Sequence, residues 1–130
     1  MIRTSQTEAK ATEAAIGKRN VVCWNEDPQA QAIRIELQTG KFFVLPVSHF
    51  LSAEFASEKN GDILVVTFST HQATLRGRRL REIALAFQKF AVESIKEIAT
   101  KYASLADPKA PLILSIEIAA TGNSALADGE

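Results

Sequence analysis

The chain has 130 residues, a mass of 14.2 kDa and a formal net charge of zero, with 46% apolar and 23% charged residues. This length fits one domain, and the balanced charge excludes both a strongly basic nucleic-acid binder and an acidic, disordered chain. No apolar run in the sequence approaches the roughly 18–20 residues of a membrane-spanning helix, so we expect no membrane span.

The chain has a single cysteine, Cys23, which excludes an intrachain disulfide. Its neighbours Val22 and Trp24 favour a small buried thiol over a catalytic nucleophile. Residues 1–20 lack the apolar core of a secretory signal, and the location we expect is cytoplasmic.

The two ends differ in composition from the middle of the chain. Residues 1–20 are rich in Ala, Thr, Glu and Lys and lack an apolar stripe, so we predict a flexible N-terminal arm. Residues 120–130 are mostly small or polar and are predicted to form a disordered tail. A single α+β domain is expected over residues 21–119.

The clearest strand pair covers residues 33–45, where apolar and polar residues alternate before the turn sequence Thr39-Gly40. A two-residue hairpin turn fits this spacing and pairs Ile35 with Val44 on one face. The opposite face of the second strand then presents three further apolar side chains. We predict that they form an interface with a second layer or a partner subunit: Phe43, Leu45 and Val47.

Three further segments extend the predicted meander. Residues 49–56 alternate well enough for a strand, which we prefer, although a short helix N-capped by Ser48 is also allowed. Residues 63–68 are almost continuously apolar and β-branched, as in a central strand. Residues 71–76 alternate again and form a fifth strand.

From Arg78 the apolar spacing changes to the period of a helix. This spacing predicts one long helix that continues through Leu105 and ends at Asp107-Pro108, about 28 residues and about 42 Å long. A last strand is predicted over residues 112–118, and it either completes the sheet or pairs with another chain. The predicted buried face of the helix is made of Leu80, Ile83, Ala84, Phe87, Phe90, Ala91, Ile95 and Ile98.

Together these elements predict an α+β domain, in which an antiparallel β-meander of about five strands packs on one long C-terminal helix. A meander closed by a C-terminal helix resembles, in outline, the pleckstrin-homology-like modules. This resemblance implies a partly open barrel and carries no function of its own.

The sequence lacks the common signatures of catalysis and cofactor binding. His49 and His71 stand outside any nucleophile motif, and His71 alternates with apolar residues as a half-buried strand residue would. The spacings typical of metal ligands and of phosphate-binding glycine loops are absent. We therefore predict no catalytic residue, no metal and no cofactor.

The predicted start of the long helix carries four arginines within six residues: Arg76, Arg78, Arg79 and Arg81. The helix dipole is already positive at this end, so the four charges need compensation. One interpretation is an anion site, where guanidinium and free helix N–H groups bind phosphate or carboxylate, including the phosphates of nucleic acid. The other is simple solvation or pairing with acids close by, of which the candidates are Glu54, Glu58, Asp62 and Glu82.

The missing catalytic groups and the surplus of apolar strand residues predict a non-enzymatic, self-associating interaction or scaffold domain. The simplest such assembly is a homodimer. The alternative function is a nucleic-acid- or anion-binding module that uses the Arg76–Arg81 segment.

Overall fold

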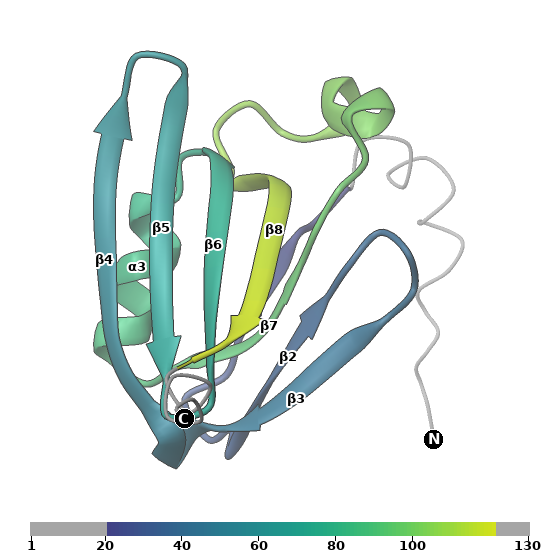
Figure 1. Cartoon of the computed structure of the whole chain (residues 1–130). Coiled ribbons are helices and arrows are strands. Elements are labelled where there is room, and N and C mark those ends of the chain that lie inside the picture. The colour runs from purple at the N-terminus through teal and green to yellow at the C-terminus, as the bar shows by residue number, and fades with distance from the viewer. Residues whose placement is uncertain (1–20, 122–130) are drawn as a thin grey trace, which may run out of the picture.

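The computed structural model describes residues 21–121, which form eight strands in two four-stranded sheets and one α-helix (Figure 1). The arm predicted over residues 1–20 lies outside the described residues, as does the predicted tail from residue 122 onward. Within the described part, no helix is long and apolar enough to cross a membrane.

The first sheet combines strands that are distant in the sequence. Its order is β1 (Trp24–Glu26), β7 (Val92–Lys96), β2 (Ala32–Glu36) and β3 (Phe42–Pro46). Strand β7 pairs antiparallel with β1 and parallel with β2, and β3 pairs antiparallel with β2. Strand β7 thus lies between two strands that come much earlier in the sequence.

The second sheet is antiparallel throughout. Its order is β4 (Phe50–Glu58), β5 (Gly61–Phe68), β6 (His71–Arg78) and β8 (Leu112–Ala120). A short 3-10 helix, η1 (Val47–His49), precedes β4, so the strand preferred for residues 49–56 is confirmed. The last strand completes this sheet beside β6.

One hydrophobic core is shared by the inner faces of both sheets and by the helix α3 (Arg81–Gln88). This helix contacts β4 and β5 and lies behind them in Figure 1. The Phe50 ring packs within 5.3 Å of the Phe87 ring and 6.0 Å of the Phe68 ring, measured between centroids. These aromatic contacts stabilise the packing of α3 against the second sheet.

The predicted long C-terminal helix is wrong, and with it the predicted fold class. Helix α3 ends at Gln88, where the N–H of Ala91 donates to the carbonyl of Ala86 (3.0 Å) and that of Phe90 to Phe87 (2.9 Å). With Phe90 at φ 55°, these bonds make a Schellman helix end. The following residues form β7 and the 3-10 helix η2 (Thr100–Leu105). The described residues are mostly β, with two sheets and one short α-helix, and do not form a five-stranded meander on a long helix.

The helical spacing led to the wrong prediction because it is compatible both with one long helix and with a short helix followed by a strand. The residue in the left-handed position of a helix end is usually glycine, and here it is Phe90, so the sequence contains no stop signal. Ile95 and Ile98 fit the helical period, yet both are buried in and just after strand β7. These residues form a strand because β7 pairs with both β1 and β2. Local periodicity does not reveal such long-range pairing.

The β2–β3 hairpin has a register that differs by one residue from the prediction. The N–H of Leu37 donates to the carbonyl of Lys41 (2.9 Å), and Gly40 in the loop has a φ of 95°. Consequently Ile35 faces Phe43 instead of Val44. Because neighbouring strand residues point to opposite faces, this shift exchanges the inner and outer faces of β3.

Strand β6 contains an irregularity between Arg76 and Gly77, where its register with β8 shifts. A Cβ atom added at Gly77 would lie 1.9 Å from the backbone oxygen of Leu112. Only glycine allows the two backbones to approach this closely.

We therefore expect Gly77→Ala to lower the free energy of unfolding by more than about 2 kcal/mol, measured by urea denaturation. Gly40→Ala is the matched control, because a Cβ there meets nothing within 4 Å. Its cost is limited to about 1–2 kcal/mol of backbone strain at positive φ. An equal or larger effect at Gly40 would contradict the close approach at Gly77.

Candidate functional site

The two histidines lie in separate surroundings. His49 is exposed in η1, whereas His71 is half-buried at the start of β6. The His71 ring lies 5.4 Å from the Phe43 ring, and its Nδ1 atom is 2.9 Å from the hydroxyl oxygen of Thr70. In residues 21–121, no group of three or more His, Cys, Asp or Glu side chains could hold a metal ion.

Cys23 is buried, as predicted, just before β1. Its Sγ atom donates to the carbonyl of Pro111 at 3.4 Å. Burial raises the pKa of this thiol to about 11, so the group is protonated at neutral pH. A protonated, buried thiol is a packing residue and not a nucleophile.

The four arginines do not share one helix end. Arg76 and Arg78 are exposed on β6, Arg79 has a φ of 57°, and Arg81 is the first residue of α3. Of the four arginines, only Arg81 therefore lies in the first turn of a helix, where the helix dipole is positive. The Nε atom of Arg79 donates to the carbonyl of Pro108 at 2.9 Å.

None of these arginines forms an ion pair with an acidic residue of the described chain. The carboxylate of Asp62, one of the candidate partners, instead accepts a hydrogen bond from the backbone N–H of Leu80 at 3.0 Å. The arginine charges consequently face solvent without an acidic partner in residues 21–121.

The hairpin register also determines where the predicted interface residues lie. Leu45 is only 6% exposed, and Phe43 and Val47 are partly buried against the core. These three side chains thus already have a packing role within one subunit. The exposed apolar residues of β3 are instead Phe42 (54%) and Val44 (57%).

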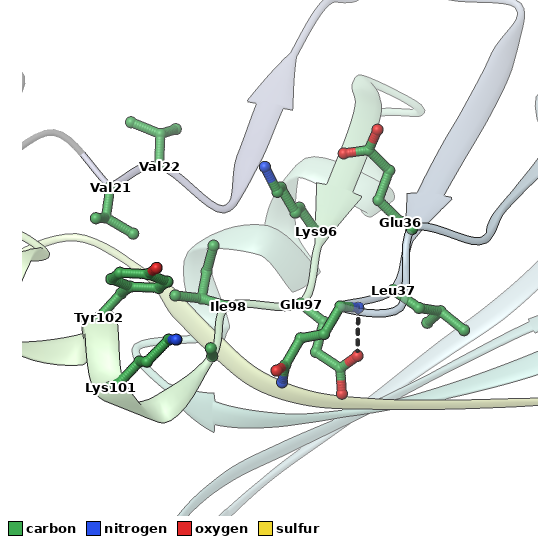
Figure 2. A pocket seen from close by; sticks show the side chains of 12 residues that line it. Val21, Val22, Glu36, Leu37, Lys96, Glu97, Ile98, Lys101 and Tyr102 are labelled. Atoms are coloured by element: carbon green, nitrogen blue, oxygen red, sulfur yellow. Dashed lines mark hydrogen bonds between the residues drawn. The ribbon is translucent and has the colours of Figure 1, made fainter.

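A pocket of about 790 Å³ lies at the other end of the hairpin, between the β2–β3 loop, the segment that follows β7, and η2 (Figure 2). Its apolar lining includes Val21, Leu37 and Ile98, and its charged lining includes Lys96 and Lys101. No local sequence pattern indicates this pocket, because its lining comes from segments that only the fold brings together.

Glu97 joins this pocket to both sheets. One carboxylate oxygen accepts from the backbone N–H of Gln38 (2.9 Å) and the other from the backbone N–H of Ile116 (3.1 Å). Figure 2 shows the first of these bonds as a dashed line at the Glu97 carboxylate. Glu97 therefore holds the β2–β3 loop in place against β8.

Comparison of the chain with protein-family models, curated proteins and solved structures finds no match.

The raised pKa of Cys23 predicts a pH dependence of stability. Below about pH 9 the thiol is protonated in the folded and unfolded states, and its contribution is complete. Between about pH 9 and 11 the unfolded chain ionises first, so the free energy of unfolding falls by up to roughly 2–3 kcal/mol. Denaturation of the native chain and of Cys23→Ala across this range measures the difference. Parallel pH profiles of the two proteins would show that the thiol makes no such contribution.

Proposed function

We propose that this protein is a non-enzymatic, self-associating interaction domain in which two copies join through the free edge of β3. The observation that carries the proposal is the outward face of this strand, where Phe42 and Val44 are both more than half exposed. Among the described strands, only β2 pairs with β3, which leaves its second edge open. An open edge with apolar side chains is a template for pairing with another chain.

The backbone of β3 is oriented for such pairing. The N–H of Val47 donates to the carbonyl of Gln31 at 2.9 Å, at the open end of the hairpin. In an antiparallel ladder the bonded residues alternate, so the N–H and C=O groups of Phe42 and Val44 point toward the free edge.

A two-fold axis at Val44 brings complementary groups together. It places Val44 opposite its own copy and Phe42 opposite Pro46 of the second copy. Pro46 has no N–H, yet its carbonyl can accept from the N–H of Phe42. The side-chain pairs are apolar, and such cross-strand pairs stabilise a sheet.

The edge strand β4 suits symmetric pairing less well. Its middle residue is Glu54, which is exposed. A two-fold axis at the centre of this strand would set two carboxylates opposite each other, which is destabilising. The exposed apolar pair on β3 and the central carboxylate of β4 therefore favour β3 over β4 for self-association.

Val44→Lys tests this assignment, because it sets two ammonium groups opposite each other at the proposed axis. We expect light scattering at micromolar concentration to give twice 14.2 kDa for the native chain and 14.2 kDa for the variant. The dissociation constant should rise by at least about tenfold, which corresponds to about 1.4 kcal/mol.

Leu51→Lys is the matched control, since Leu51 is 63% exposed and lies on an edge strand of the second sheet, β4. This variant should remain a dimer. A native chain that is monomeric, or a dimer lost only in Leu51→Lys, would contradict pairing through β3.

The arginine segment supports a second candidate function, the binding of polyanions such as nucleic acid. The specific observation is that all four arginines are exposed and have no acidic partner in the described chain. Unpaired guanidinium groups are well suited to phosphate oxygens, which they contact through two parallel hydrogen bonds.

Titration with single-stranded RNA and duplex DNA at low salt tests this second function. Changing all four arginines to glutamine should weaken binding and, for duplex DNA, reduce the slope of log affinity against log salt concentration by roughly 0.9 per lost phosphate contact. The control removes the same charge elsewhere on the surface through glutamine at four exposed lysines: Lys41, Lys59, Lys89 and Lys96. No binding by the native chain, or equal losses in the two variants, would remove this function.

A cytoplasmic location belongs to the first proposal. It is supported by the single, buried Cys23, which needs no partner thiol and is suited to a reducing compartment. Cell fractionation should recover the protein with cytoplasmic markers, and recovery with secreted proteins would contradict this location.

A further inference from the structure

The pocket beside η2 has the size and walls of a small-molecule site. Its volume of about 790 Å³ falls within the usual range of about 300–1,000 Å³ for ligand pockets. Val22 and Tyr102 line it and are 62% and 46% exposed, so apolar surface is open to an incoming molecule. In Figure 2 the Tyr102 ring lies below Val21 and next to the Lys101 side chain.

The carboxylates of the pocket already have partners. Both oxygens of Glu97 accept backbone N–H groups. Glu36 forms an ion pair with Arg34, with 3.4 Å between Oε2 and Nε. Both oxygens of Glu97 are therefore engaged within the protein, and one oxygen of Glu36 is paired with Arg34.

The ammonium groups of the pocket are not used in this way. Neither Lys96 nor Lys101 forms an ion pair within residues 21–121. Lys101 lies only over the Tyr102 ring, with its Nζ atom 5.2 Å from the ring centroid. The donors left available to a ligand are thus cationic.

We infer that this pocket binds a small carboxylate with an apolar body. The carboxylate group would contact the ammonium group of Lys96 or Lys101, and the apolar body would lie against Val22 and Tyr102. A singly charged group fits better than a doubly charged phosphate, because the carboxylates of Glu36 and Glu97 line the same pocket and repel excess negative charge.

This inference is independent of the proposed dimer. The pocket lining does not include Phe42 or Val44. The monomeric variant Val44→Lys should therefore bind the carboxylate as the native chain does, and failure of one proposal leaves the other intact.

The test is a titration followed by the backbone amide NMR signals of the full chain. Three probes separate charge from apolar surface: 2-naphthoate, its uncharged analogue 2-naphthol, and acetate. We expect 2-naphthoate to shift the amide signals of Gly40, Ile98 and Ala99, which line the pocket. We expect 2-naphthol to bind roughly fivefold to tenfold more weakly and acetate more weakly still.

The double variant Lys96→Gln/Lys101→Gln should weaken 2-naphthoate binding by a similar factor and leave 2-naphthol unchanged. Lys89→Gln is the control, because Lys89 is exposed at the end of α3 and does not line the pocket. Both sites of the double variant are exposed, and Lys101→Gln alone provides a milder version.

Three results would overturn the inference. They are equal affinities for 2-naphthoate and 2-naphthol, shifts centred outside the pocket, and unchanged 2-naphthoate binding in the double variant. Absence of any 2-naphthoate binding to the native chain would overturn it as well.

Discussion

The pairing of Ile35 with Phe43 is the contact on which the arrangement of the first sheet depends. It directs the side chains of Phe43 and Leu45 toward the core, where the Phe43 ring contacts the ring of His71 in the second sheet. The same pairing turns Phe42 and Val44 outward and creates the apolar edge proposed for self-association. It also fixes the loop around Gly40, which lines the pocket proposed for a carboxylate. One residue of register thus determines core, edge and pocket together.

The Schellman end of α3, with Phe90 in the left-handed position, is the second constraint, because it allows the residues that follow to form β7. Strand β7 lies between β1 and β2 and is parallel to β2, so the first sheet cannot form from local hairpins alone. Glu97 follows directly and ties the β2–β3 loop to β8. A helix extended past this point would remove both the central strand and the bridge between the sheets.

The sequence predicted features that depend on nearest neighbours and missed those that depend on distant ones. Strand character was evident over residues 63–68 and 112–118, and burial of Cys23 followed from its apolar neighbours. The helix was overextended because Phe90 occupies a position that glycine usually marks. The predicted two-residue turn was wrong, so the residues expected to be exposed on β3 were displaced by one position. The pocket has no local signature, because segments distant in the sequence line it.

The register of the β2–β3 hairpin can be measured directly by nuclear Overhauser contacts between Hα protons. Residues that face each other without exchanging hydrogen bonds bring their Hα atoms together across an antiparallel pair. The structure predicts a strong contact between the Hα protons of Arg34 and Val44, which are opposite each other. A contact between the Hα protons of Ile35 and Val44 in its place would show the other register, and would remove the exposed edge on which the proposed self-association is built.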